Sequence, residues 1–191
     1  MEHQFIADQE LSQKDFTVET FAVGDYESCT FKNCNFANVN LSQVKFIDCE
    51  FEACNLSSAN IYETGFQDVA FFECKMLGLQ FDKADTFGFS ITVKDCQLNH
   101  ASFYKVNLNS SSFEGCNFQQ ADFSEASLKG VTLTNCNFQL AVFDGTNLEH
   151  ANFKGATNYT INPEKNRITK AKFNYPEVLG LLEAYQITVE D

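Results

Sequence analysis

A large apolar residue recurs at every fifth position along most of this chain. In the stretch SFEGCNFQQADFSEASLKGVTL, residues 112–133, these residues are Phe113, Phe118, Phe123, Leu128 and Leu133. An α-helix turns by 100° per residue and a strand alternates faces at every residue, so neither element buries one side chain in five. The pattern instead predicts a coil of equivalent five-residue units.

Each unit also specifies an inside and an outside. A small residue stands two places before the large one, as Cys116 does before Phe118. Residues two apart lie on the same side of an extended segment, so both are expected to point inward. The remaining positions are mostly polar and are expected to face solvent.

The five-residue phase predicts the boundaries of the coil. It runs unbroken from Phe16 to Phe81 and resumes at Val93, shifted by two residues, to end at Phe153 with a brief return at Phe173. The shift predicts a bulge at residues 84–91 within a β-helix spanning residues 16–173. Gln4 and Gln9 occupy small inward slots, so residues 1–15 are expected to form a ragged N-terminal cap.

The cysteines indicate how many units make one turn. All eight occupy the small inward slot, and six of them are spaced by twenty residues, except for one step of 22 across the bulge: Cys34, Cys54, Cys74, Cys96, Cys116 and Cys136. Four units therefore make one square turn, stacked on the next at about 4.8 Å. Because these sulfurs form a ladder instead of converging on one point, we interpret them as buried packing residues and predict no metal site.

The charge composition of the chain limits which partners it can bind. The 191-residue chain has 26 acidic and 13 basic residues, a formal charge of −13, which argues against direct binding to nucleic acid or to an anionic membrane. The N-terminal residues lack the pattern of a signal peptide, and no 18-residue apolar run occurs. We therefore expect a cytoplasmic protein with a positively charged partner.

Enzymatic motifs are weak in this sequence. The histidines are isolated, and no phosphate loop, nucleophile elbow or zinc-binding HExxH motif appears. Carboxylate pairs such as Glu50 with Glu52 fall at outward positions and are interpreted as solvated charges. The sequence predicts a protein that is not an enzyme and needs no cofactor.

The outward residues differ between the edges of the coil. The cysteine edge carries a nearly uncharged ladder of Asn35, Asn55, Lys75, Gln97, Asn117 and Asn137. Acids concentrate on the other three edges, where we select as candidate partner contacts Asp25, Asp48, Asp68, Asp82, Asp122, Glu125 and Asp144. They serve either for solubility alone or as an electrostatic surface for a basic cleft.

Units such as CNFQQADFSEASL and AVFDGTNLEHANF resemble the pentapeptide-repeat proteins. The resemblance implies an all-β fold, a right-handed quadrilateral β-helix with four repeats per turn. The segment at residues 74–98 and the C-terminal tail look like the Qnr-type quinolone-resistance branch. That likeness implies a dimeric DNA mimic that binds DNA gyrase and topoisomerase IV and relieves quinolone poisoning. Qnr proteins of Gram-negative bacteria carry two longer loops, whereas this chain has only the short bulge.

The bulge is a second candidate contact, formed by Asp85, Thr86, Phe87, Gly88 and Phe89. Each coil has one large inward slot per edge, so at least one of the two phenylalanine rings is expected to stay outside. An exposed aromatic residue beside acids is typical of a recognition site. A local lid over the corner of the coil is the alternative.

The tail at residues 174–191 is expected to close the last coil. Asn174 is a candidate N-cap, Pro176 and the run EVLGLLEAY predict a short helix, and Ile187–Val189 predicts a terminal strand. A second copy is expected to pack on the apolar residues Leu179, Leu181, Leu182, Tyr185, Ile187 and Val189. A cap without dimerisation remains the alternative.

These observations lead to one functional hypothesis and two alternatives. Roughly seven coils give a rod of roughly 34 Å, and two rods end to end match roughly 20 base pairs of duplex. We expect a homodimer that occupies the DNA-binding surface of gyrase or topoisomerase IV and protects it from quinolones. The alternatives are an acidic scaffold with another partner and an immunity factor against a natural gyrase toxin.

Overall fold

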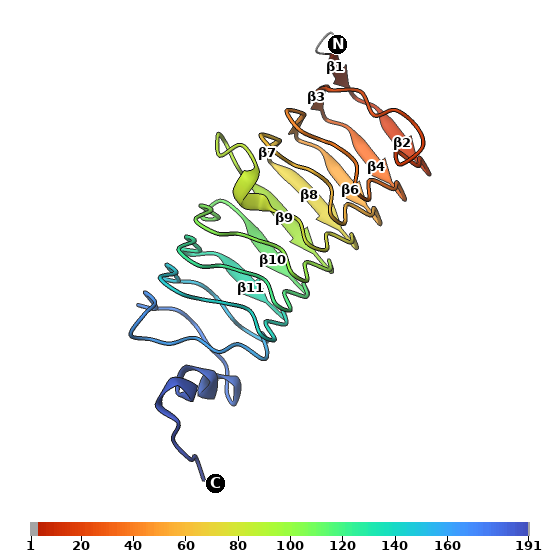
Figure 1. The fold of residues 1–191 in the computed structure, drawn as a ribbon. Coiled ribbons are helices and arrows are strands. Elements are labelled where there is room, and N and C mark those ends of the chain that lie inside the picture. The colour runs from red at the N-terminus through yellow and green to blue at the C-terminus, as the bar shows by residue number, and fades with distance from the viewer. Residues whose placement is uncertain (1–3, 191) are drawn as a thin grey trace.

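The computed structural model describes residues 4–190, and the chain winds through them as a β-solenoid with a nearly square cross-section (Figure 1). Successive coils are joined by parallel pairing, in register every 20 residues, as in Phe31↔Phe51 and Phe113↔Leu133. The predicted all-β fold of four five-residue units per turn is confirmed.

Two sides of the rod are parallel sheets. The β1 side is formed by β1 (Gln4–Ala7), β3 (Gly24–Glu27), β5 (Lys45–Ile47) and β7 (Gly65–Gln67). The β2 side is formed by β2 (Glu10–Ser12), β4 (Thr30–Lys32), β6 (Glu50–Glu52), β8 (Val69–Phe72), β9 (Ile91–Lys94), β10 (Ser112–Glu114) and β11 (Thr132–Thr134). Bridges to Asn152 and then Lys172 continue the β2 side toward the C-terminus.

The other two sides are held by single bridges between coils. The amide side carries Asn35, Asn55, Lys75, Gln97, Asn117 and Asn137, and the Asp122 side carries Asn40, Asn60, Gln80, Ser102, Asp122 and Val142. On the amide side the ladder extends to the side chains, since Asn137 Nδ2 donates to Asn117 Oδ1 at 3.2 Å. Following the chain, the β1 side precedes the β2 side, then the amide side, then the Asp122 side.

The interior is a column of stacked side chains. Phe31 and Phe51 stack with ring centroids 4.6 Å apart, and Phe103 and Phe123 stack at 5.0 Å with nearly parallel planes. The cysteines fill the small slots beside these rings and are all buried. One apolar residue from each side in each coil therefore makes a continuous core.

The corners of the square depend on backbone conformation. Many non-glycine residues two places after the large one adopt the left-handed region, for example Asp48 at φ 50° and Lys105 at φ 61°. None of these left-handed residues is β-branched, because a branched Cβ clashes there. The side chain directly before the large residue supports the turn, since Asn35 Oδ1 accepts the N–H of Ala37 at 3.2 Å.

The two-residue shift lies on the β1 side, between Asp85, which bonds to Thr64 in the regular register, and Ile91. A 3₁₀ turn, η1 (Phe81–Lys83), leads into the bulge, which projects from the rod in Figure 1. Beyond it β8 pairs with β9 through Val69↔Ile91, 22 residues apart. The column therefore continues without a change of direction.

The N-terminal region is more regular than expected. We predicted a ragged cap at residues 1–15, yet β1 pairs with β3 and β2 pairs with β4 in full register. Ile6 and Leu11 pack against the core in the positions that the phase gives them. Backbone pairing tolerates Gln4 and Gln9 in the small slots because both side chains are exposed at the end of the rod. Residues 1–3 of the predicted cap lie outside the described residues.

The C-terminal tail differs from the prediction in two ways. The predicted helix is a pair of 3₁₀ turns, η2 (Glu177–Leu181) and η3 (Glu183–Tyr185), and Pro176 takes the N-cap position in place of Asn174. Ile187–Val189 is not a strand, because no strand edge of the described chain lies beside it to pair with. The turns still cover the last coil, where the N–H of Ile161 donates to the carbonyl of Gly180.

Candidate protein-interaction surface

The bulge separates its two phenylalanines. Phe89 is 9% exposed and packs against Phe66 and Phe81, with ring centroids 6.2 Å away in each case. Phe87 is 74% exposed at the tip of the bulge. The prediction that at least one ring stays outside is confirmed, and the sequence did not indicate which one.

Hydrogen bonds fix the bulge to the coil beneath it. The N–H of Asp85 donates to the carbonyl of Thr64 at 2.9 Å, and the N–H of Ser90 donates to that of Phe66 at 3.0 Å. Asp85 Oδ1 accepts the N–H of Phe87 at 3.0 Å, which turns the chain at the tip. Phe87 is therefore presented from an anchored loop.

The conformation at the tip favours a glycine. Gly88 has φ 65°, and a Cβ there would stand 3.2 Å from the side chain of Gln67. Gln67 Nε2 also donates to the carbonyl of Phe87 at 3.4 Å. A hollow of about 390 Å³ next to the bulge is lined by Asp68, Thr86, Gly88, Phe89, Ser90, Asn107 and Ser110.

The predicted acidic residues gather on two adjacent sides of the rod. Asp25, Asp48 and Asp68 belong to the β1 side, and Asp82, Asp122, Glu125 and Asp144 belong to the Asp122 side. The bulge crosses the β1 side, from Asp85 bonded to Thr64 to Ser90 bonded to Phe66. The sequence placed the acids outward but did not bring them together with the bulge.

The local settings of these acids differ. Asp82 was predicted as an outward contact, but its side chain is only 11% exposed and its Oδ2 lies 2.8 Å from Lys83 Nζ, because η1 folds the two together. Hydrogen bonding to Asp82 raises the pKa of Lys83. Glu125 lies 3.4 Å from Lys105 Nζ, and Asp144 lies 3.9 Å from Lys165 Nζ. Asp48 and Asp68 are exposed at the corner with the β2 side.

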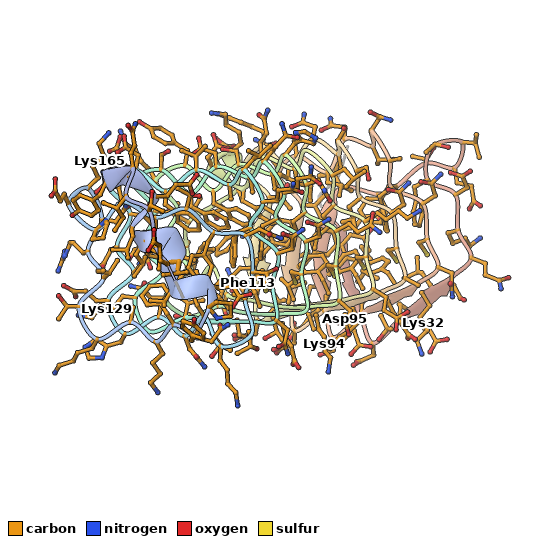
Figure 2. All side chains as sticks on the ribbon, turned by 90° about the horizontal axis from the view of Figure 1, so that it is seen from below. Lys32, Lys94, Asp95, Phe113, Lys129 and Lys165 are labelled. Carbon is orange, nitrogen blue, oxygen red and sulfur yellow. The ribbon has the colours of Figure 1, made fainter. Side chains whose placement is uncertain are left out.

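The β2 side holds a further acidic group that we did not select. A hollow of about 430 Å³ is lined by Glu50, Glu52, Phe72, Glu73, Lys94 and Asp95. In Figure 2 Lys32, Lys94 and Asp95 lie along one side of the rod, while Phe113 lies inside it. The signal in the sequence was Phe72, a large apolar residue at an outward position of the repeat.

The cysteines act as donors within the core. Cys54 Sγ donates to the carbonyl of Phe31 at 3.2 Å, and Cys74 Sγ donates to that of Phe51 at 3.3 Å. Burial raises the pKa of Cys49 to about 11, so its thiol stays protonated at neutral pH. Among the described residues, no group of three or more His, Cys, Asp or Glu side chains is arranged to hold a metal ion.

The C-terminal turns divide the predicted dimerisation residues into two sets. Leu181 packs against the core of the last coil. The other five are exposed and form what we call the C-terminal apolar surface: Leu179, Leu182, Tyr185, Ile187 and Val189. All of them except Tyr185, together with Gly180 and Glu183, line a hollow of about 380 Å³. Within residues 4–190 no helix has the length and apolar character needed to cross a membrane.

Solved structures with the same fold include two of QnrB1, described as a plasmid-mediated fluoroquinolone resistance protein. A trypsin-treated form is 21% identical with a TM-score of 0.63, covering 97% of this chain and 99% of that chain. The full-length form is 18% identical with a TM-score of 0.57, covering 96% and 100%. At these identities the likeness shows the fold.

Sequence comparison assigns the family. No curated protein sequence matches the chain. The family model described as a pentapeptide repeat region matches residues 25–103 and 89–162, which together span well over half of the 191 residues. These matches follow the coils that the structure displays from β3 to the bridge between Thr132 and Asn152. The chain belongs to the pentapeptide-repeat proteins.

Proposed function

We propose that this protein binds DNA gyrase or topoisomerase IV as a DNA mimic and protects the enzyme from quinolones. The observation that carries the proposal is the likeness to a fluoroquinolone resistance protein over 97% of this chain and 99% of that one, which includes the C-terminal tail as well as the repeats. The proposal places the protein in the cytoplasm, as a homodimer joined through the C-terminal apolar surface. It requires no cofactor and no catalytic step.

The dimensions of the rod support this proposal. The seven strands of the β2 side and the two bridges that follow form a ladder of nine rungs. At about 4.8 Å per step the ladder is roughly 38 Å long, so two copies end to end span roughly 22 base pairs at about 3.4 Å each. Carboxylates held on such a ladder keep fixed spacings, as phosphates do along a duplex.

The arrangement of the contacts also supports it. The Asp122 side and the β1 side are adjacent and carry the selected acids, and Phe87 projects from the bulge on the β1 side. A basic groove that accepts DNA would meet carboxylates on two adjacent sides and one aromatic side chain. The amide side, which is nearly uncharged, would face away from the enzyme.

A supercoiling assay tests the proposal. Purified protein should restore supercoiling by gyrase, or decatenation by topoisomerase IV, in the presence of a fluoroquinolone. Asp48→Asn with Asp68→Asn should weaken protection, because both side chains are exposed and neither supports the core. As a matched control, Asn35→Asp with Asn55→Asp adds charge only to the amide side and should leave protection unchanged. Absence of rescue, of inhibition and of co-purification with either enzyme would favour a scaffold with another partner.

A further inference from the structure

The corner where the β1 side meets the β2 side carries opposite charges at its two ends. Its outward positions are the last two of each β1-side unit and the second of the next β2-side unit. Toward the N-terminus the charged residues at these positions are Asp8, Glu10, Glu27, Asp48, Glu50 and Asp68, which we call the acidic half. Toward the C-terminus they are Lys129, Glu149, His150, Lys170 and Lys172, which we call the basic half.

Ion pairs do not neutralise the net charge of either half. Among residues 4–190, the only ion pair of the acidic half joins Glu10 to Lys32 Nζ at 4.0 Å. In the basic half Glu149 is bound by Lys129 at 3.4 Å and by Arg167. Lys170 and Lys172 are exposed and form no ion pair with any residue that the structure describes. The corner therefore ends in a negative and a positive surface.

The stretch between the two halves is uncharged and borders the bulge. It is formed by Ser90, Thr92, Ser110 and Ser112, with Ser90 Oγ donating to the carbonyl of Ser110 at 3.0 Å. Because β8 pairs with β9 across the bulge, Ser90 follows Asp68 on the corner. Ser90 thus lies midway along the column that begins at Asp8 and ends at Lys170. About this point Asp8 mirrors Lys170 and Glu10 mirrors Lys172. Glu27 mirrors Glu149, whose charge is already neutralised by Lys129 and Arg167.

We propose that two copies of this chain associate side by side in antiparallel orientation through this corner, with a two-fold axis near Ser90. In that orientation the acidic half of each copy faces the basic half of the other, and Asp8 opposes Lys170. A parallel alignment would bring like charges together. A two-fold contact uses the same surface on both copies, so both sets of opposite charges form at once.

This association goes beyond the proposed function and does not depend on it. It leaves the C-terminal apolar surface uncovered, so it differs from end-to-end joining. It would cover Asp48 and Asp68, and therefore compete with any partner that binds the acids at this corner. Because exposed ion pairs are individually weak and are screened by salt, the association should be weak and sensitive to ionic strength.

Charge exchange between two variants tests the proposal. Lys170→Glu with Lys172→Glu makes the corner acidic at both ends, and Asp8→Lys with Glu10→Lys reverses the charges of the residues that oppose Lys170 and Lys172. Lysine fits the left-handed position of Asp8, since Lys105 and Lys170 already occupy such positions at φ 61° and 59°. Circular dichroism should therefore show an unchanged β-solenoid in both variants.

Analytical ultracentrifugation at about 10 mM and about 1 M salt supplies the readout, because the Debye length falls from about 30 Å to about 3 Å between them. The wild type should show an association step at low salt that high salt removes. Each variant alone should lose this step, with its Kd raised about tenfold or more, and an equal mixture of the two should recover it as a heterodimer.

Lys14→Glu with Lys75→Glu, the same charge change on the amide side, is the matched control and should retain the step. A wild type with no salt-dependent association, or a mixture that recovers none, would overturn the proposal. So would a step that Leu182→Glu abolishes, because it would belong to the C-terminal apolar surface.

Discussion

Phe118 illustrates what one side chain contributes to this core. Its ring is fully buried, stacks on Phe138 with centroids 5.2 Å apart, and meets Phe113 and Phe123 edge-on at 5.3 and 5.2 Å. The coils above and below are fixed by their backbone ladders. The interior therefore cannot close around a missing ring.

We expect Phe118→Ala to lower the free energy of unfolding by about 3–5 kcal/mol, through lost burial and the cavity left behind. Cys116→Ala removes only a small side chain from the same coil and should cost much less. Urea denaturation followed by circular dichroism measures both. Equal decreases in the free energy of unfolding from the two variants would contradict the packing role of the cysteines. Unfolding of the wild type by a chelator or a reductant would contradict it as well.

Two buried tyrosines differ in what their hydroxyls contact. Tyr26 Oη donates to the carbonyl of Ala22 at 2.9 Å, whereas Tyr159 Oη has no hydrogen-bond partner among the described residues. Removing a bonded hydroxyl loses its hydrogen bond, and removing an unbonded buried one relieves a desolvation cost. We expect Tyr26→Phe to destabilise by about 0.5–1.5 kcal/mol and Tyr159→Phe to be neutral or stabilising, as measured by urea denaturation at pH 7. A larger loss of stability from Tyr159→Phe than from Tyr26→Phe would contradict these hydrogen-bond assignments.

The same tyrosines predict an alkaline pH dependence. Burial raises the pKa of Tyr26 to about 12, and likewise that of Tyr159, above the value of 10.0 for an exposed tyrosine. The folded state favours the neutral form, so this stabilisation is complete below pH 10 and is lost as the pH rises toward 12. Each phenylalanine variant should lose less stability than the wild type over that range, and the double variant least. If the free energy of unfolding fell equally with pH in the wild type and in the variants, neither tyrosine would have a raised pKa in the folded state.

The bulge is an addition to a complete coil. It lengthens one turn by two residues, and both of its ends are hydrogen-bonded to the coil beneath, through Asp85 and Ser90. Only Phe89 of its two rings contributes to the core. The projecting part can therefore be removed without disturbing the column.

Deletion of Phe87 and Gly88 restores the 20-residue step and should leave the melting temperature nearly unchanged. If Phe87 contacts the enzyme, the deletion should weaken protection of gyrase, and Phe87→Ala should do so with the loop retained. Leu140→Ala, which removes an exposed apolar side chain from the amide side, is the matched control. Full protection by a well-folded deletion variant would leave the acidic sides as the only contact.

The C-terminal turns make the two ends of the rod different. Leu181 covers the last coil, whereas Leu182 and its exposed neighbours face outward. Basic residues also concentrate toward this end, where Figure 2 shows Lys129 and Lys165, far from Lys32 near the other end. End-to-end joining would therefore place the basic ends of two rods at the centre of the assembly.

We expect Leu182→Glu to yield monomers with intact coils, because a charge would enter the proposed apolar contact. Leu181→Glu should instead loosen the turns from the last coil and lower the thermal stability. Light scattering with circular dichroism distinguishes the two effects. A wild-type protein that is monomeric at micromolar concentration at all ionic strengths would remove the argument for a longer rod.

The repeat determined the fold without any structure. Phe118 and Cys116 could be assigned to the interior, and the step from Cys74 to Cys96 predicted the extra residues of the bulge, because each unit repeats the same local choice of inward and outward side chains. A period of five with four units per turn has one way to bury its large residues. The fold thus followed from local pattern alone.

Tertiary structure decided which of two similar residues faces inward. Phe87 and Phe89 are separated by one residue, and Leu181 and Leu182 are adjacent. In each pair one residue packs on the core and the other is exposed, because of the coil that lies beside them in space. The expected strand at Ile187–Val189 has the composition of a strand but no neighbouring edge to pair with. The charges of the corner are likewise spread over residues 8–172 and become one surface only when the coils stack. A five-residue pattern specifies what each unit buries, whereas contacts between units twenty residues apart specify what the surface presents.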